Sequence, residues 1–202
     1  MRAKVIRVDP EHPDPGVIHQ AAGLLRRGGL VAFPTETVYG LGANLEDPQA
    51  ISELYQVKER PFHKQLTLHI ADPAVIENHG VQVSPLAKRL MARFWPGPLT
   101  LILSRPDGST LGFRMPRHPV ALALLAQAGV PVVAPSANLS GHAPPRGAQE
   151  VLRDLGEKID LILDSGPTPV GVESTVLDLS TDPPKILRRG AMAQEIEEAL
   201  QG

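Results

Sequence analysis

The sequence contains no cysteine, which excludes disulfides, thiolate metal sites and a cysteine nucleophile. Aromatic residues make up only 3% of its 202 residues, so leucine, valine, isoleucine and alanine must fill the core. No apolar run approaches the roughly 20 residues needed to span a bilayer, and residues 1–15 lack the apolar stretch of a signal peptide. We therefore expect a cytoplasmic protein that does not contact membranes.

Several common catalytic motifs are also missing. The chain has no G-x-x-x-x-G-K-[ST] phosphate loop, no G-x-S-x-G nucleophile elbow and no H-E-x-x-H zinc motif. Its seven histidines are dispersed and show no ligand spacing beside a carboxylate. We expect no metal site built from protein side chains and no serine-hydrolase chemistry.

The remaining composition is that of an ordinary globular protein. Hydrophobic residues make up 42% and charged residues 21%, with a formal net charge of -2. This balance gives no overall reason to expect a nucleic-acid partner, although it is compatible with a local basic cleft. With no repeat and no long linker, we expect one domain over residues 1–202.

Apolar periodicity predicts strands that alternate with helices. Asp47 and Ser84, each followed by proline, are typical helix N-caps. The turn 105–109 should join two neighbouring strands, so the pattern favours an α/β fold with a mixed sheet covered by helices. The expected strands are 3–8, 30–33, 65–70, 99–104, 111–115, 130–135, 161–166 and 174–180. The expected helices are 16–29, 48–60, 85–95, 119–129, 148–159 and 193–200.

The stretch FPTETVYGLGAN (33–44) stands where we expect a buried strand to pass into a helix. It places Thr35, Glu36, Thr37 and Tyr39 beside glycines that permit close approach of the backbone to a ligand. In α/β sheets, ligands bind at strand ends. A helix entry with threonines as local caps is the alternative explanation.

Cations follow in two other stretches. Lys58 and Arg60 in KERP end a predicted helix, where the helix dipole alone could stabilise them. Arg114 interrupts an apolar strand. Arginine is rarely buried without a partner, so its guanidinium should meet either an internal carboxylate or an anionic ligand.

Hydroxyls recur near further strand ends. APSANLSG sets Ser136 and Asn138 on alternate positions, although a polar turn would use the same residues. VGVESTVLDL and KILRRGA add Ser174, Thr175, Arg188 and Arg189. Hydroxyls and cations at successive strand ends together favour a cleft for an anionic small molecule.

These stretches, in this order, carry a family resemblance. PTETVYGLGAN (34–44), the Lys58-x-Arg60 pair, PSANLSG (135–141), ESTVLDL (173–179) and ILRRGA (186–191) resemble the YrdC-like threonylcarbamoyl-AMP synthases. The resemblance extends from about residue 15 to the last predicted helix. It implies a twisted mixed sheet flanked by helices around a basic concave face, in the short, single-domain form of the family.

The resemblance also implies a reaction. Threonine and bicarbonate or carbon dioxide form a carbamate, which attacks the α-phosphorus of ATP to give threonylcarbamoyl-AMP and pyrophosphate. Mg²⁺ would enter bound to ATP, and downstream proteins would transfer the product to adenosine 37 of tRNA. Such chemistry requires cations and hydrogen-bond donors that align anions, without a covalent nucleophile.

Site residues follow position by position from the same resemblance. Threonine would contact Thr35, Thr67, Arg114, the backbone of Ala134 and Ser174. ATP would contact Lys58, Arg60, Thr110, Ser136, Asn138 and Arg188, with backbone contacts near Phe62 and Pro144. Lys58 and Arg60 would also be the catalytic pair.

The sequence departs from the family pattern at two points. Gln65 stands where a proline is usual, so the loop between Lys58 and Thr67 could follow another path. Arg189 also replaces a common proline, and we favour its neighbour Arg188 as the nucleotide contact. The Pro-rich segment 140–147 suggests a mobile lid over the labile product.

Two other functions remain as alternatives. One is an RNA-binding module without synthase activity, whose affinity would fall steeply with salt. The other is an enzyme of the same fold that acts on a different carbamoyl or acyl-adenylate substrate. Short hydroxyls at strand ends, without evident aromatic platforms for bases, favour a small-molecule enzyme over RNA binding.

Overall fold

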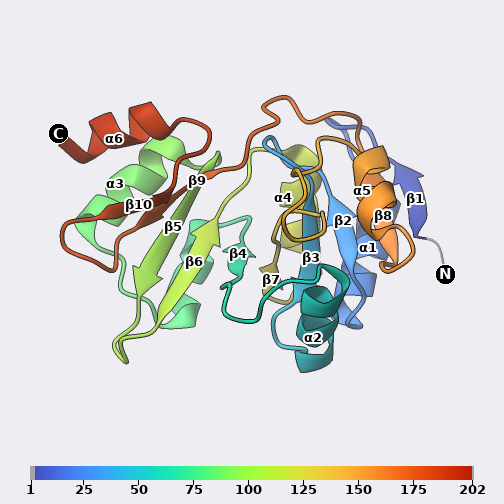
Figure 1. Cartoon of the computed structure of the whole chain (residues 1–202), viewed down its shortest axis with the longest axis horizontal. Helices are drawn as coiled ribbons and strands as arrows, with labels where there is room; N and C mark the ends of the chain where they lie inside the picture. Colours follow the sequence, from blue (N-terminus) through green and yellow to red (C-terminus); the bar gives the residue numbers. More distant parts are fainter. Residues whose placement is uncertain (1–2, 202) are drawn as a thin grey trace.

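The computed structural model describes residues 3–201, in which ten strands form one sheet. The order across the sheet is β1-β8-β2-β3-β7-β4-β6-β5-β9-β10 (Figure 1). The strands are β1 Lys4–Arg7, β2 Val31–Phe33, β3 Gly40–Asn44, β4 Thr67–His69, β5 Leu99–Ser104, β6 Thr110–Arg114, β7 Val132–Val133, β8 Leu161–Asp164, β9 Thr175–Asp178 and β10 Lys185–Arg188. The helices are α1 Pro15–Arg26, α2 Pro48–Val57, the 3₁₀ helix η1 Pro73–His79, α3 Pro85–Phe94, α4 Pro119–Ala128, α5 Ala148–Leu155 and α6 Ala193–Gln201.

The sheet is mixed, which confirms the predicted fold class. β8 pairs in parallel with β1 and β2, and parallel pairs also join β4 to β6 and β5 to β9. The other five pairs are antiparallel, including the predicted hairpin of β5 and β6, in which Ser104 stands opposite Thr110. The order of the strands places residues distant in the sequence at the centre of the sheet.

Local sequence determines where the helices begin. The Asp47 carboxylate accepts a hydrogen bond from the Gln49 N–H at 2.9 Å, and the Ser84 hydroxyl accepts one from the Ala87 N–H at 3.1 Å. Both helices start at the proline that follows the cap, as the sequence predicts. None of the helices in residues 3–201 is both long and apolar enough to cross a bilayer.

The prediction for residues 33–44 was wrong in one respect. The stretch joins β2 to β3 as an antiparallel pair, with Phe33 opposite Gly40, and it does not pass into a helix. Gly42 permits the close packing of this pair, because a Cβ atom there would lie 3.0 Å from the Phe33 ring. Helix α2 begins only at Pro48.

Besides β3, two elements were not predicted, and helices α2 and α5 are shorter than expected, with α5 ending at Leu155. The 3₁₀ helix η1 and strand β10 lie in segments that the periodicity left unassigned. The helix expected over 48–60 ends at Val57, because Lys58 is its C-cap and Glu59 follows with a positive φ of 50°. The chain therefore turns away from the helix at the KERP motif.

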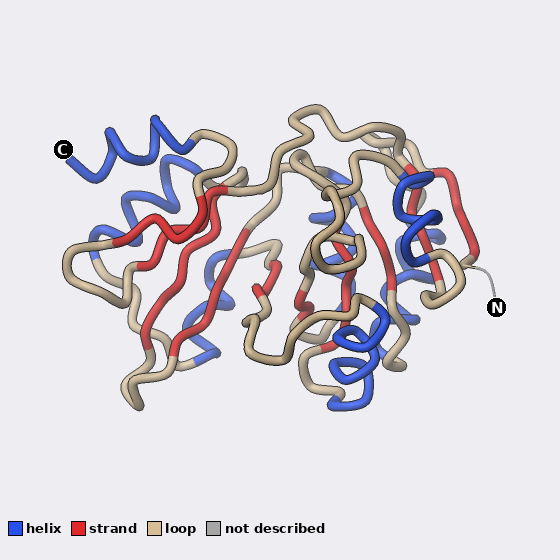
Figure 2. The backbone as a smooth tube through the Cα atoms, in the orientation of Figure 1, coloured by secondary structure: helices blue, strands red, loops and turns tan. Residues whose placement is uncertain are grey.

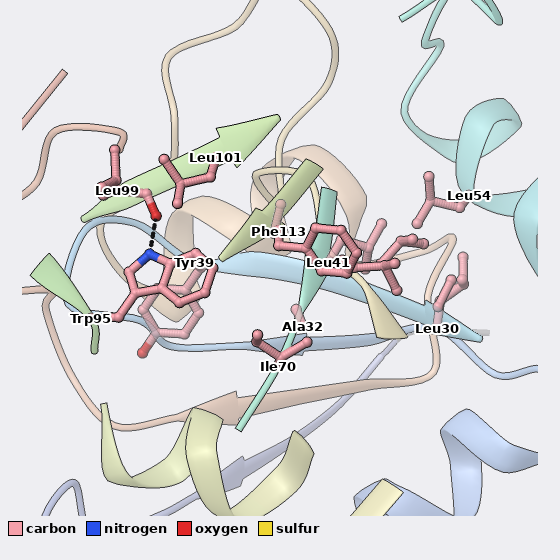
Figure 3. Close-up of a cluster of buried hydrophobic side chains, with 14 of the residues drawn as sticks. Leu30, Ala32, Tyr39, Leu41, Leu54, Ile70, Trp95, Leu99, Leu101 and Phe113 are labelled. Atoms are coloured by element: carbon pink, nitrogen blue, oxygen red, sulfur yellow. Dashed lines mark hydrogen bonds between the residues drawn. The ribbon is translucent and has the colours of Figure 1, made fainter. Parts of the chain in front are cut away.

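The buried hydrophobic side chains form two clusters, and successive residues of β2 belong alternately to one and to the other. Ala32 belongs to a cluster with Leu41, Leu54, Trp95 and Phe113, shown in Figure 3, where the Trp95 indole N–H donates to the Leu99 carbonyl at 2.7 Å. Val31 and Phe33 belong to the second cluster, which packs residues of α1 and α4. Figure 2 shows loops gathered in the middle of the molecule, around the short strands β4 and β7.

Candidate active site

A cavity of about 220 Å³ lies at the centre of the sheet, lined by residues from β4, β5, β6, β9 and β10 and from the loops after β2 and β7. Eight of the predicted site residues line it. They include all five proposed threonine contacts, Thr35, Thr67, Arg114, Ala134 and Ser174, and the proposed ATP contacts Arg60, Ser136 and Arg188. Residues from six separate stretches of the chain thus meet in one place.

Five predicted residues lie outside the cavity wall, and all five were assigned to ATP. Lys58 and Asn138 are buried, and Phe62 is 77% exposed with its ring 5.0 Å from the Tyr55 ring. Thr110 begins β6, and Pro144 is half-buried in the loop before α5. The cavity is smaller than the roughly 300–1,000 Å³ of sites for drug-sized ligands, so a nucleotide would have to extend beyond it.

Arg114 ends β6 and has an internal carboxylate partner. Its Nη2 atom donates to the Thr37 hydroxyl at 2.7 Å and lies 3.0 Å from Oε2 of Glu36. The Thr37 hydroxyl lies 2.9 Å from that of Thr35, which donates to the Val38 carbonyl at 2.6 Å. Of the two partners that the sequence left open for Arg114, the structure supplies the internal carboxylate, while the side chain still lines the cavity.

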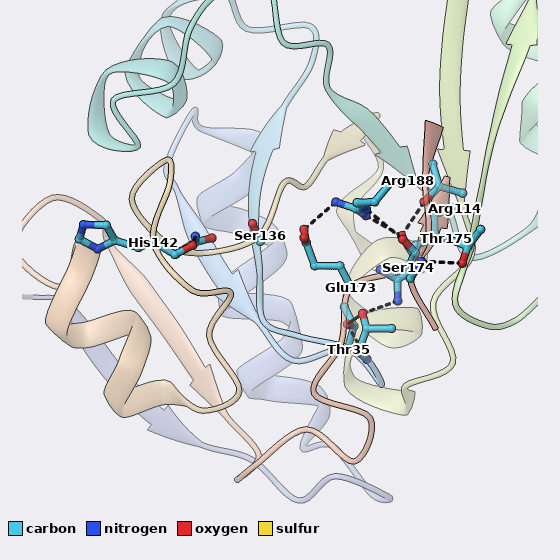
Figure 4. A network of polar contacts seen from close by, with 12 residues as sticks. Thr35, Arg114, Ser136, His142, Glu173, Ser174, Thr175 and Arg188 are labelled. Carbon is cyan, nitrogen blue, oxygen red and sulfur yellow. Dashed lines mark hydrogen bonds and ion pairs between the residues drawn. The ribbon is translucent and has the colours of Figure 1, made fainter. Parts of the chain in front are cut away.

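Arg188 also lines the cavity and contacts Glu173 and Ser174. It donates from Nη1 to Glu173 at 2.7 Å and from Nη2 to the Ser174 hydroxyl at 3.1 Å (Figure 4). The Ser174 hydroxyl also lies 2.9 Å from that of Thr100. Arg189, by contrast, pairs with Glu197 of α6, so Arg188 is the one of the two adjacent arginines that lines the cavity.

Lys58 holds the loop that carries Ser136 and Asn138. Its side chain is almost fully buried, and its ammonium donates to the carbonyl oxygen of Ser136 and, at 2.5 Å, to that of Asn138. Its own carbonyl accepts a hydrogen bond from the Ser140 N–H at 2.8 Å. Burial, helped by the charge of Arg60, lowers the pKa of Lys58 to about 7. Lys58 therefore contacts the backbone of the predicted ATP loop.

Backbone carbonyls also accept hydrogen bonds in the loop after α2 and in the segment 140–147. Arg60 donates from Nη2 to the carbonyl of Gln65 at 2.8 Å, a contact that any residue at position 65 could provide. In the segment 140–147, the Pro145 carbonyl accepts a hydrogen bond from the Tyr39 N–H at 2.9 Å. The proposed lid is thus anchored near both ends, and its motion stays a prediction.

The cavity residues that were not identified as site residues from the sequence include Glu173, Thr100 and His69. Glu173 was part of the quoted motif ESTVLDL, so its carboxylate beside Ser174 was a usable signal. Thr100 lies inside β5, and nothing in LTLILS distinguishes it from an ordinary strand threonine. His69 is completely buried, and burial together with the charge of Arg114 lowers its pKa to about 3. It therefore adds no positive charge to the cavity near neutral pH.

Solved structures with this fold include one with a bound amino acid. The crystal structure of Pyrococcus abyssi Sua5 complexed with L-threonine superposes with a TM-score of 0.91 at 42% identity, covering 98% of this chain and 61% of that one. The crystal structure of Escherichia coli YciO gives a TM-score of 0.84 at 30% identity, covering 94% of this chain and 96% of that one. These similarities agree with the fold class that the sequence predicted.

Curated relatives include named synthases. The threonylcarbamoyl-AMP synthase of Bacillus subtilis (strain 168) is 49% identical over 195 residues, which are 92% of this chain and 56% of that protein. The synthase of Pyrococcus abyssi (strain GE5 / Orsay) is 44% identical over 193 residues, 91% of this chain and 57% of that protein. The chain thus spans little more than half the length of these two relatives. The model of the Sua5/YciO/YrdC family, described as "Telomere recombination", matches residues 23–190, and together with these identities it shows that the chain belongs to this family.

Proposed function

We propose that this chain binds ATP and L-threonine in and around the central cavity and, with bicarbonate or carbon dioxide, forms threonylcarbamoyl-AMP and pyrophosphate. The supporting observation is that the five residues assigned to threonine line one cavity together with Arg60 and Arg188. The names of the two synthase relatives support the same activity.

The cavity is suited to aligning anions. The threonine nitrogen would bond to the carbon of carbon dioxide and lose a proton, and a carbamate oxygen would then attack the α-phosphorus while pyrophosphate leaves. Arg114 would hold the amino-acid carboxylate, and Arg60 and Arg188 would neutralise the phosphates. Bringing three reactants into one geometry removes much of the entropic barrier, so no covalent nucleophile is needed.

Magnesium would accompany the nucleotide in this proposal. Residues 3–201 contain no group of three or more histidine, aspartate or glutamate side chains arranged to hold a metal ion. Glu173 lines the cavity, but it is paired with Arg188 at 2.7 Å. Phosphate oxygens and water would therefore supply the ligands, as is common for nucleotide-bound Mg²⁺, and the ion would neutralise phosphate charge.

The product implies further partners. Threonylcarbamoyl-AMP is an activated acyl-adenylate, so downstream proteins that transfer the threonylcarbamoyl group to adenosine 37 of tRNA belong to this proposal. Direct contact between RNA and the basic concave face, and a cytoplasmic location, stay predictions. The uncharacterized Escherichia coli protein YciO, 31% identical over 91% of this chain, has the same fold. Family membership alone therefore does not establish the activity, which has to be measured.

The first experiment is pyrophosphate release from ATP and Mg²⁺ by the purified chain, with threonine and bicarbonate added separately and together. We expect release only when both are present. Arg188→Gln should slow it, whereas the matched variant Arg189→Gln should not, because Arg189 pairs with Glu197 outside the cavity. Release that needs neither substrate, or no release while RNA is retained at low salt, would contradict the proposal.

A further inference from the structure

Glu36 and Arg114 form a buried ion pair in which Arg114 lines the cavity and Glu36 does not. Their side chains are 8% and 6% exposed, and Oε2 of Glu36 lies 3.0 Å from Nη2 of Arg114. Within residues 3–201, the two carboxylate oxygens of Glu36 and the Nε atom of Arg114 have no hydrogen-bond partner. The two side chains thus face each other mainly as charges, and each retains unused hydrogen-bonding capacity.

The backbone fixes Glu36 in this position. The Glu36 carbonyl accepts a hydrogen bond from the Val170 N–H at 3.0 Å, and the next carbonyl, of Thr37, accepts one from the Gly171 N–H at 2.9 Å. His118 also senses the charge of Glu36, and burial lowers the pKa of that imidazole. Arg114 is therefore the cation that Glu36 faces.

The charged groups around the cavity form two sets that differ in net charge. In the first set, Glu36 balances Arg114, and the nearby His69 is neutral. In the second set, two arginines, Arg60 and Arg188, stand against the one carboxylate of Glu173. The Glu36–Arg114 pair is electrically neutral, and the Arg60–Arg188 set is cationic.

We propose that Glu36 is a positioning and specificity-determining residue, which neutralises Arg114 so that the subsite beside Arg114 selects a zwitterionic amino acid over a simple carboxylate. Glu36 does not line the cavity, so it acts through Arg114. A zwitterion bound beside the neutral Glu36–Arg114 pair adds no net charge. A carboxylate without an ammonium group would leave one uncompensated buried charge, which is costly. The inference rests on the proposed binding of threonine and extends it to the class of ligand.

Equilibrium calorimetry on the full chain tests this proposal, with L-threonine and with 3-hydroxybutyrate, which has the same skeleton without the ammonium group. The wild-type chain should prefer threonine by about tenfold or more. In Glu36→Gln the preference should fall by about tenfold, because 3-hydroxybutyrate binds more tightly to the uncompensated Arg114. If Glu36 had a purely structural role, Glu36→Gln would weaken the binding of both ligands equally and leave the ratio of their affinities unchanged.

Two variants serve as controls. Glu36→Asp keeps the charge and should keep the preference, and Glu197→Gln removes a surface carboxylate that pairs with Arg189, so it should leave the ratio unchanged. An unchanged ratio in Glu36→Gln would overturn the inference alone. If that variant does not fold, equal affinity of the wild-type chain for the two ligands would overturn it. Absence of threonine binding to the wild-type chain would overturn the proposed function as well.

Discussion

Two sets of charges around the cavity are held in different ways. In the Glu36–Arg114 pair, cation and anion are both almost completely buried and balance each other. In the Arg60–Arg188 set, the charges are more accessible, with the Arg188 side chain 41% exposed, and the cations outnumber the carboxylate of Glu173. A buried charge requires a partner within the protein, whereas a partly hydrated charge can remain available to a ligand. This difference supports zwitterion recognition by the first set and phosphate recognition by the second.

The largest effect should come from breaking the buried pair. Arg114→Met leaves the Glu36 carboxylate buried without its cation, so we expect a loss of about 3–5 kcal/mol in the free energy of unfolding, measured by urea denaturation. The double variant Glu36→Met/Arg114→Met removes both charges and should regain much of that loss without regaining threonine binding. Equal instability of the single and double variants would show that the pair does not act as a unit.

Lys58 is a buried cation that has no carboxylate partner in the described part of the chain, and its effect on stability should depend on pH. Its pKa is about 7 in the folded chain and near its ordinary value of 10.5 when unfolded, so between these values the unfolded state binds more protons. The contribution of Lys58 to the free energy of unfolding should therefore rise with pH, by about 1.4 kcal/mol per pH unit within that window, and stay constant below pH 7. Urea denaturation of wild-type and Lys58→Met chains from pH 7 to 10 measures the difference. Lys88→Met, at an exposed position, should follow the wild-type slope. Identical slopes for Lys58→Met and wild type would refute a buried, titrating Lys58.

A variant of Arg188 tests whether the cations Arg60 and Arg188 bind the phosphates of ATP. Arg188→Gln should weaken ATP binding by about 1.5–3 kcal/mol, the usual range for a hydrogen bond to a charged group, and should lower the salt dependence of binding. Fluorescence titration with a labelled ATP analogue at two salt concentrations measures both effects. Arg189→Gln is the matched control, because Arg189 pairs with Glu197 on α6. Similar losses in the two variants would argue against a specific nucleotide contact by Arg188.

The smallest effect should come from a neutral hydroxyl. Ser174→Ala removes a group that contacts Thr100 and Arg188, so threonine affinity should fall by about 1 kcal/mol, or roughly fivefold. Calorimetric titration with threonine measures the loss, and Ser109→Ala, in the exposed β5–β6 turn, is the control. An unchanged threonine affinity would remove Ser174 from the proposed threonine site.

Local sequence patterns predicted much of the fold, but they did not predict which groups the buried cations contact. Asp47 and Ser84 cap helices as expected, because a cap and its N–H partners lie within three residues of each other. The stretch 33–44 was expected to pass from a buried strand into a helix, with threonines as local caps in the alternative explanation, whereas Gly40–Asn44 pairs with β2 as a strand. Lys58 illustrates the same limit, since its partners are carbonyls some eighty residues away.

The sequence by itself determined which chemistry is available: no cysteine, alternating strands and helices, and hydroxyls and cations near strand ends. These properties depend on residue type and on spacing within one element. Only the tertiary structure decided that Glu36 faces Arg114, that Arg188 lines the cavity and that Arg189 pairs with α6. Such choices depend on sheet order and register, through which β6 brings Arg114 to a loop 77 residues earlier, where it meets Thr37. Sequence spacing carries no information about contacts made across that separation.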